Sequence, residues 1–491
     1  MEHKLSKQVL KQLPKSISVP SYEDQSLTAG IIHIGVGNFH RAHQAYYMDR
    51  LFEAGHDHDW AIVGAGIKSY DSTMRDRLSK QDWLTTLLTL DPDKLSARVI
   101  GSMIDFLPID SAKIVEALSK PEIRIVSLTI TEGGYYIDSG TDDFDSAHPE
   151  IIADVANPNN PQTVFGLLIA SLKKRRDLSI APFTVMSCDN LPENGHVTKR
   201  TLLALAKMID TELAEWIEDN VAFPNGMVDC ITPATTNHEI ELVKNEFGVI
   251  DLAPVTCEAF HQWVLEDKFP NGRPKLEKVG VEFVDDVRPY ELMKLRILNG
   301  GHAIIAYTAA LLDITYAHEA LEHPVINAYM DRVIREEIIP IVPPVPNTSL
   351  EDYLLSIQER FSNPRIADRI DRLCFDGSNR QPKFIIPSII DSLRDSTVPT
   401  GLIIECAMWC RYCQGKTDSG KEITSNDPNW DYLHKTAMGA VTHPEMWLEM
   451  TDIYGDLGQN KAFREQFSEV LIYLTEHGVE KTLNAYINRS L

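Results

Sequence analysis

Short apolar runs alternate with helical patterns through the first half of the chain, and this alternation constrains the fold more than any other feature of the sequence. The runs are rich in β-branched residues and are bounded by Gly, Asp or Pro, as expected for strands buried on both faces of a parallel sheet. They occupy residues 30–36, 60–63, 123–131 and 183–188, with helical patterns such as 39–54 and 160–176 between them. The sequence therefore predicts βαβ units in a doubly wound sheet.

The pattern changes near residue 288. Beyond it, residues 289–312, 323–339, 349–362 and 400–414 have the periodicity of amphipathic helices, and strand candidates are few. A chain of 491 residues is long enough for two or three domains. We expect an α/β protein with a Rossmann-type dinucleotide-binding domain over 1–288, followed by a mostly helical, substrate-binding domain over 289–491.

Charge and composition exclude several classes of partner. The chain has 71 acidic and 47 basic residues, a formal charge of −24, and such a field repels nucleic acid and anionic lipid. No apolar run approaches the ~18 residues of a membrane span. The polar N-terminus lacks the apolar segment of a signal peptide, and seven cysteines are few for a disulfide scaffold. These features predict a soluble, cytoplasmic protein that binds a small molecule.

The sequence HIGVGNFHR, residues 33–41, is typical of a dinucleotide-binding turn. An expected strand runs into Gly35 and Gly37, and a helical pattern that includes Phe39 follows at once. Glycines at such a turn let backbone N–H groups approach a pyrophosphate. His40 stands where the third glycine of the GxGxxG pattern belongs, so a tight turn without a ligand remains an alternative. Asp71, after the second strand, could accept hydrogen bonds from an adenosine ribose, which favours NAD over NADP.

A second group of polar residues lies on one expected helix. At about 100° per residue, Glu291, Lys294, Asn299 and His302 fall on one side of the segment 290–302. This pattern suggests Lys294 as a general base, Asn299 as a donor to a developing alkoxide and His302 as a group that orients a hydroxyl. Acting as a base requires desolvation to lower the lysine pKa from ~10.4. A solvated helix with a snorkelling lysine is the structural alternative.

Polar groups also follow the fourth expected strand, in SCDNLPENG at 187–195, at the sheet edge where open α/β sheets bind ligands.

Two other patterns are weaker indications of function. Tyr290 and Lys294 match the Tyr-x-x-x-Lys pair of short-chain dehydrogenases, but they stand at the start of the helical half. Cys406, Cys410 and Cys413 form an i, i+4, i+7 stripe among apolar residues, which predicts buried core thiols.

Five extended motifs, in the expected order, resemble the polyol-specific long-chain dehydrogenases, the mannitol dehydrogenase family. They are HIGVGNFHRAHQAYY (33–47), SLTITEGGYY (127–136), FTVMSCDNLPENG (183–195), WVLEDKFPNGRP (263–274) and PYELMKLRILNGGH (289–302). The resemblance covers nearly the whole chain. It implies a nicotinamide cofactor bound by a Rossmann-type domain, a mostly helical C-terminal domain, no metal in the reaction, and a monomer.

The resemblance also implies roles for individual residues. Lys294 is the catalytic lysine, Asn190 and Asn299 form the oxyanion hole, His302 positions the substrate, and Glu291 exchanges protons beside the lysine. Asp229, Arg372 and Arg380 match positions that line the polyol pocket, and Asn190 also lies by the cofactor. Two departures are Tyr70, where a second acidic residue often precedes Asp71, and Cys230, where arginine is usual after Asp229.

We therefore expect an NAD-dependent oxidoreductase that interconverts D-mannitol and D-fructose by lysine-assisted, metal-independent hydride transfer. Within the same chemistry the alternatives are an arabinitol or sorbitol dehydrogenase and a sugar-acid reductase of the fructuronate type, in which Arg372 and Arg380 would grip a carboxylate. A non-catalytic NAD-binding sensor is the alternative from another class. A sensor would need Gly35, Gly37 and Asp71, but not Lys294 and both asparagines.

Overall fold

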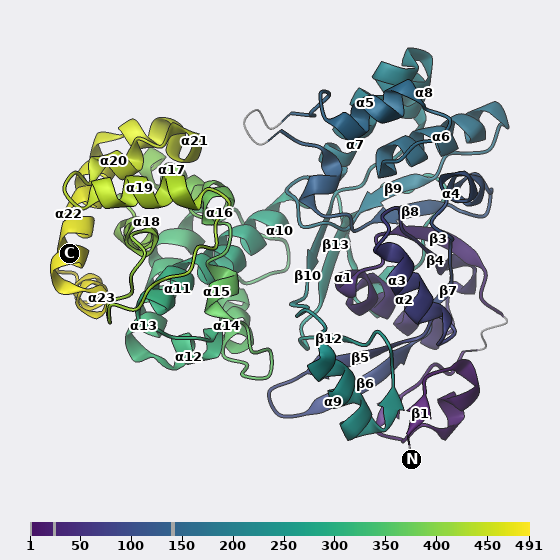
Figure 1. Ribbon diagram of the computed structural model, residues 1–491, viewed down its shortest axis with the longest axis horizontal. Coiled ribbons are helices and arrows are strands. Elements are labelled where there is room, and N and C mark those ends of the chain that lie inside the picture. The colour runs from purple at the N-terminus through teal and green to yellow at the C-terminus, as the bar shows by residue number, and fades with distance from the viewer. Residues whose placement is uncertain (1, 23–25, 139–142) are drawn as a thin grey trace. The chain divides into compact units, whose positions relative to one another are not determined.

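The computed structural model describes residues 2–22, 26–138 and 143–491, and the chain divides into two compact units, Met1–Arg288 and Pro289–Leu491 (Figure 1). Within the described residues, no helix is both long enough and apolar enough to cross a bilayer.

A five-stranded parallel sheet organises the described residues of the first unit. The strands lie in the order β7-β4-β3-β8-β9, so the chain starts in the middle, adds two strands on one side and then crosses to the other. This order confirms the predicted doubly wound sheet. The bounds are Ala29–Ile34 (β3), Ala61–Ala65 (β4), Met103–Phe106 (β7), Ile125–Leu128 (β8) and Thr184–Ser187 (β9).

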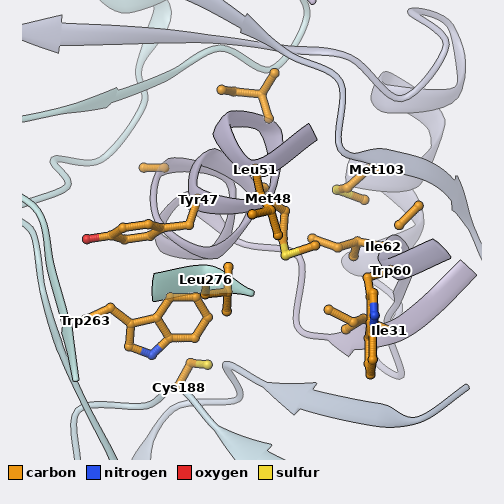
Figure 2. Close-up of a cluster of buried hydrophobic side chains, with 14 of the residues drawn as sticks. Ile31, Tyr47, Met48, Leu51, Trp60, Ile62, Met103, Cys188, Trp263 and Leu276 are labelled. Carbon is orange, nitrogen blue, oxygen red and sulfur yellow. The ribbon is translucent and has the colours of Figure 1, made fainter. Parts of the chain in front are cut away.

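Both faces of this sheet are buried. Ile31 and Ile62 belong to one apolar cluster, in which Ile62 points toward Met48 of helix α2 (Figure 2). Ile32 and Val63, their neighbours along the strands, belong to a second cluster on the opposite face. The helices of this unit are Asn38–Ala42 (α1), Gln44–Glu53 (α2), Asp71–Ser79 (α3), Ser111–Leu118 (α4), Pro149–Ala156 (α5), Val164–Asp177 (α6), Asn194–Ile209 (α7), Thr211–Asn220 (α8) and Asn237–Phe247 (α9).

Three smaller sheets, none of them predicted from the sequence, are present among the described residues of the first unit. A mixed sheet has the order β12-β5-β6-β2, a second has the order β10-β13-β14, and β1 pairs with β11. Their strands are His3–Lys4 (β1), Ile17–Ser18 (β2), Thr85–Leu90 (β5), Leu95–Ile100 (β6), Gly226–Asp229 (β10), Val249–Ile250 (β11), Val255–Cys257 (β12), Gln262–Glu266 (β13) and Glu282–Val284 (β14). Short 3₁₀ segments lie at Lys7–Gln12, His58–Trp60, Glu132–Tyr135 and Leu276–Val279.

The second unit is helical, as predicted, and the β-structure within residues 289–491 is limited to isolated bridges. Cys406, Cys410 and Cys413 are buried in α18, which packs against α11 and α22, so their prediction as core thiols is confirmed. The α-helices are Arg288–Met293 (α10), Gly300–Leu311 (α11), Ala317–Glu322 (α12), Pro324–Val333 (α13), Leu350–Phe361 (α14), Ile370–Leu373 (α15), Gly377–Phe384 (α16), Ile386–Arg394 (α17), Thr400–Cys413 (α18), Trp430–Ala440 (α19), Glu445–Leu448 (α20), Thr451–Tyr454 (α21), Lys461–His477 (α22) and Val479–Ile487 (α23). Two segments are π-helical, Lys294–Asn299 and Ile334–Ile338, and two are 3₁₀, Ile339–Ile341 and Gly455–Gln459.

Candidate active site

The turn between β3 and α1, residues 35–37, is called the glycine turn below. Gly35 has φ of +99°, and a Cβ there would lie 2.0 Å from the carbonyl oxygen of Thr129, so the fold itself requires glycine. At Gly37 a Cβ would meet only the Gly35 carbonyl oxygen, at 3.9 Å. The protein therefore has room for a side chain at Gly37, and the space beside that glycine stays open.

A buried arginine that the sequence analysis did not single out supports the glycine turn. Arg41 Nε donates to the carbonyl oxygen of Gly37 at 3.2 Å, and its other nitrogens donate to Asn38 Oδ1 and to the carbonyl oxygen of Ala253. Burial lowers the pKa of Arg41 to about 10, so the guanidinium stays charged near neutral pH. It places a positive charge beside the turn in a strongly acidic protein.

The helix after the glycine turn is shorter than predicted. The expected single helix over 39–54 is wrong, because the backbone of His43 is not helical and separates α1 from α2. Phe39 stacks on His43, with ring centroids 4.8 Å apart. With only five residues in α1, the turn presents its backbone N–H groups with little help from a helix dipole.

His40, in the position of the missing third glycine, packs into the protein. Its ring stacks on that of His33 at 3.5 Å, and its Nδ1 lies 3.1 Å from Gln44 Oε1. Burial lowers the pKa of His33 to about 3 and that of His40 well below its usual value, so both rings are neutral near pH 7. His33 also contacts Thr129 and Ser127 at 2.9 and 2.8 Å, which links β3 to β8 beneath the turn.

Asp71 follows β4 and lies at the same edge of the sheet as the glycine turn, because β4 and β3 are parallel neighbours. Its Oδ2 accepts hydrogen bonds from the backbone N–H groups of Ile67 and Lys68, both at 2.8 Å. The Lys68 ammonium pairs with Glu150 at 2.7 Å rather than with Asp71. The carboxylate thus shapes the loop after β4, while the Tyr70 side chain is exposed.

Asn190 lies after β9 at the same edge of the sheet, and its neighbour Asp189 fixes the local backbone. The Asp189 carboxylate accepts hydrogen bonds from the N–H groups of Ile130 and Thr131, at 3.0 and 2.9 Å, and from the Tyr135 hydroxyl at 2.7 Å. These bonds join the loops after β8 and β9. Asp189 lies in the polar segment 187–195 that was predicted to follow this strand, although the residue itself was not singled out.

Asp229 is buried at the end of β10, where it pairs with Gln262 of β13. Asn194 holds this strand to the start of α7, because its side chain donates to the Gly226 carbonyl and accepts from the Gly226 N–H, at 2.8 and 2.9 Å. The predicted pocket residue Asp229 therefore has a fixed backbone in the first unit.

In the second unit, Lys294 and Asn299 are the first and last residues of a π-helical segment. The predicted uniform advance of 100° per residue from 290 to 302 is therefore wrong, because a π-helix has i→i+5 hydrogen bonds and more residues per turn. Glu291 and Lys294 are both 7% exposed. π-helical turns are rare and are often found at functional sites.

The Tyr290 hydroxyl, the alternative acid in a Tyr-x-x-x-Lys pair, donates to the carbonyl oxygen of Pro346 at 3.3 Å. Arg296, between Lys294 and Asn299, pairs with Asp391. Both contacts are structural, and they secure the segment that carries Lys294.

The imidazole of His302 is held between Phe361 and Asp368. It stacks on the Phe361 ring at 4.0 Å, and its Nε2 lies 3.8 Å from Asp368 Oδ2. Burial lowers the pKa of His302 to about 3, although Asp368 acts in the opposite direction. The ring is neutral near pH 7, so it can take part in hydrogen bonds without carrying charge.

Asp368, absent from the sequence predictions, also binds one of the predicted pocket arginines. Arg372 Nε and Nη2 donate to its two carboxylate oxygens at 2.7 and 2.6 Å. Arg380 donates to the carbonyl oxygens of Leu373 and Arg372, at 3.0 and 3.4 Å. The structure thus brings His302 and Arg372 together at Asp368, and Arg380 contacts the backbone that carries Arg372.

Comparisons of both units with known proteins give the same family. The model of the mannitol dehydrogenase Rossmann domain matches residues 29–278, and that of the mannitol dehydrogenase C-terminal domain matches residues 286–474. A mannitol 2-dehydrogenase of Cereibacter sphaeroides is 56% identical over 478 residues, which cover 97% of this chain and 100% of that protein.

Two solved structures are similar over almost their full length. Pseudomonas fluorescens mannitol 2-dehydrogenase, in a ternary complex with NAD and D-mannitol, is 42% identical with a TM-score of 0.89, covering 99% of this chain and 100% of that one. A D-sorbitol dehydrogenase in substrate-free form is 34% identical with a TM-score of 0.90, covering 98% and 100%. Together with the two matching domain models, these similarities show that the chain belongs to the mannitol dehydrogenase family.

Proposed function

We propose that this chain is an NAD-dependent mannitol 2-dehydrogenase that interconverts D-mannitol and D-fructose without a metal ion. The observation that carries the proposal is the 42% identity, over 99% of this chain, to the Pseudomonas fluorescens enzyme whose structure holds NAD and D-mannitol.

The first unit has the features that NAD would need. The open space at Gly37 allows close approach of a pyrophosphate, and the Arg41 guanidinium supplies positive charge beside the turn. The negative charge of Asp71 disfavours a 2′-phosphate, which supports NAD over NADP. When bound, NAD supplies the hydride acceptor for the alcohol carbon.

Lys294 would take the proton of the reacting hydroxyl. Its side chain is buried and stands at the start of a π-helical turn, which gives it a defined direction. Glu291, also buried and one turn earlier, would pass the proton onward.

The amides of Asn190 and Asn299 would donate hydrogen bonds to the oxygen as negative charge develops on it. Preorganised donors of this kind stabilise an alkoxide directly, and a base provides the remaining proton transfer. With both tasks performed by side chains, the proposed chemistry needs no metal ion.

The surroundings of His302 favour a polyol over a sugar acid. A neutral imidazole suits an uncharged hydroxyl, and Asp368 neutralises Arg372, one of the two arginines that would otherwise bind a substrate carboxylate. We therefore favour polyol oxidation over fructuronate reduction as the activity of this chain.

The test is a substrate panel with the purified full-length chain after dialysis against a strong chelator. NADH absorbance is followed with mannitol, sorbitol, arabinitol, fructose and fructuronate, and NADP is compared with NAD. The proposal predicts the highest kcat/KM for mannitol with NAD, with fructose as the product. Faster fructuronate reduction, preference for NADP, binding of NADH without turnover, or an activity loss that Zn²⁺ restores would contradict it.

A further inference from the structure

Two cysteines and a histidine from three separate segments of the first unit meet in space, outside the proposed catalytic residues. Cys230 follows β10, Cys257 ends β12 and His261 precedes β13. One ligand atom of each, the two Sγ atoms and a ring nitrogen, all lie within 4.8 Å of one another. No other such group of three occurs among the described residues. We call these three residues the cysteine–histidine site.

Strand register explains how the site forms. β10 and β13 are antiparallel, with Asp229 opposite Gln262, so the next pair along this register is Cys230 and His261. The backbone N–H of Glu258 donates to the Ile231 carbonyl at 3.0 Å, and the Ile231 N–H donates to Glu258 Oε1 at 2.6 Å. These two bonds hold the segment that carries Cys257 against the segment that carries Cys230.

The spacing fits a tetrahedral metal ion. With metal–sulfur and metal–nitrogen bonds of about 2.3 and 2.0–2.1 Å, two such ligands lie roughly 3.6 Å apart. Cys257 Sγ and His261 Nε2 are 3.7 Å apart. The three atoms would need to move by only a few tenths of an ångström to about 1 Å to coordinate one ion.

The histidine has the support that a metal ligand needs. Its Nδ1 lies 3.3 Å from the Ala259 carbonyl oxygen and its Nε2 lies 3.2 Å from the Ala42 carbonyl oxygen. In the tautomer with hydrogen on Nδ1, the Ala259 contact is a hydrogen bond and Nε2, which faces Cys257 Sγ, is available to a metal ion. Tyr46 covers the ring, with centroids 4.6 Å apart. Cys230 and Cys257 are buried, whereas His261 is partly exposed and gives an ion a path from solvent.

We propose that Cys230, Cys257 and His261 bind one thiophilic divalent cation, of the class of Zn²⁺ or Cd²⁺, with water in the fourth position. Two sulfur ligands and one imidazole select such ions over Mg²⁺ or Ca²⁺, which prefer oxygen. Binding forms two metal–sulfur bonds and one metal–nitrogen bond while the two thiol protons leave to solvent. The bound ion and two thiolates are together neutral, which suits a buried position.

The site lies beside a residue of the proposed polyol pocket, because Cys230 directly follows Asp229. None of its three residues takes part in the proposed proton or hydride transfer. The cation is therefore distinct from the reaction chemistry, and its binding is measured without an activity assay.

The experiment is a Cd²⁺ titration of the full-length chain, reduced and stripped of metal. Cadmium–thiolate bonds give an ultraviolet charge-transfer band, and calorimetry gives the stoichiometry. We expect one Cd²⁺ per chain with the band present. Cys230→Ser and His261→Gln should each weaken the affinity at least about tenfold, with a smaller band in Cys230→Ser.

Cys413→Ser is the matched control, because Cys413 is also a buried thiol but lies in α18. It should keep the wild-type affinity and band, and circular dichroism checks that each variant is folded. Absence of stoichiometric binding would overturn the proposal. So would a full band in folded Cys230→Ser, an equal loss in Cys413→Ser, or calcium competing as well as zinc.

Discussion

Burial determines which groups of the candidate site carry charge. Burial lowers the pKa of the fully buried His33 and of the largely buried His302 to about 3, which leaves both rings neutral near pH 7. Arg41, equally buried, keeps its charge because its pKa falls only to about 10. The imidazoles can therefore act as hydrogen-bonding groups, while the guanidinium supplies the fixed positive charge beside the glycine turn.

Substitution of Asp368 should show how much activity depends on the positioning of substrate-binding side chains, because Asp368 itself takes no part in the proposed proton or hydride transfer. It lies against His302 and binds Arg372 with both oxygens. In Asp368→Asn the imidazole and guanidinium lose this common partner, and misplacement of substrate-contacting groups typically costs about 10 to 100-fold. We expect kcat/KM for mannitol to fall by that amount with an unchanged KM for NAD, as measured by steady-state kinetics.

Asp371→Asn is the matched control, since the Asp371 side chain is exposed and pairs with Arg369, and an asparagine Oδ1 can still accept its hydrogen bond from the Arg372 N–H. It should keep wild-type kinetics. Equal effects of the two substitutions, or a rise in the KM for NAD in Asp368→Asn, would show that Asp368 does not position the polyol-binding groups.

At the scale of elements, the glycine turn contains two glycines with different functions. In Gly35→Ala the methyl group would collide with the Thr129 carbonyl at a positive φ, so we expect a loss of about 2 to 4 kcal/mol in unfolding free energy. In Gly37→Ala the methyl group has room, and stability should change by less than about 1 kcal/mol. NAD binding by Gly37→Ala should nevertheless weaken roughly tenfold or more, because the methyl group occupies the space of the pyrophosphate.

Denaturant unfolding and fluorescence titration with NADH measure the two effects on the same preparations. Unimpaired NADH binding by a folded Gly37→Ala variant would mean that the pyrophosphate lies elsewhere. A fully stable Gly35→Ala variant would contradict the account of the turn.

Four of the five parallel strands were predictable because each is a short apolar run buried on both faces. The fifth, β7, was not predicted, since its sequence MIDF is short and includes the exposed Asp105. The short edge strands were not: β2 and β11 have two residues each, and their pairing depends on segments far away in the chain. The interruption of the helix at His43 could not be predicted either, because the sequence around His43 keeps a helical apolar pattern.

Periodicity places candidate residues on a helix but does not reveal a π-helical turn. The segment from Lys294 to Asn299 reads as ordinary α-helix, and only packing of the second unit selects the wider turn. The same holds for Asp368, which lies 66 positions beyond His302 and meets it only in the folded chain. The residue types therefore indicated the chemistry of the site, but the hydrogen-bond and ion-pair partners of each side chain were known only from the structure.

At the scale of the whole molecule, stability should depend on pH through a carboxyl group in the second unit. Glu405 is fully buried in α18 and accepts a hydrogen bond from Gln381 at 2.5 Å. Burial raises its pKa from the ordinary 4.5 to about 8. Between these values the unfolded chain loses the proton and the folded chain keeps it, so this group lowers the unfolding free energy as pH rises.

Glu405→Gln removes this titration. Since one pKa unit corresponds to about 1.4 kcal/mol, the variant should gain a few kcal/mol relative to wild type between about pH 5 and 8. Denaturant unfolding across that range measures the gain, with exposed Glu465→Gln as the control. Parallel pH profiles of wild type and Glu405→Gln would show that burial does not keep Glu405 protonated.

The central claim is that Lys294 takes the proton from mannitol, and the Lys294→Ala variant tests it most directly. Mannitol oxidation should fall by about 10² to 10⁴-fold, its rise with pH should vanish, and small primary amines should restore part of the rate. NAD affinity should stay unchanged, because the glycine turn lies in the first unit. Tyr290→Phe should keep most of its activity, since the Tyr290 hydroxyl bonds to a backbone carbonyl. Near-normal turnover by Lys294→Ala, with Tyr290→Phe inactive, would contradict the account.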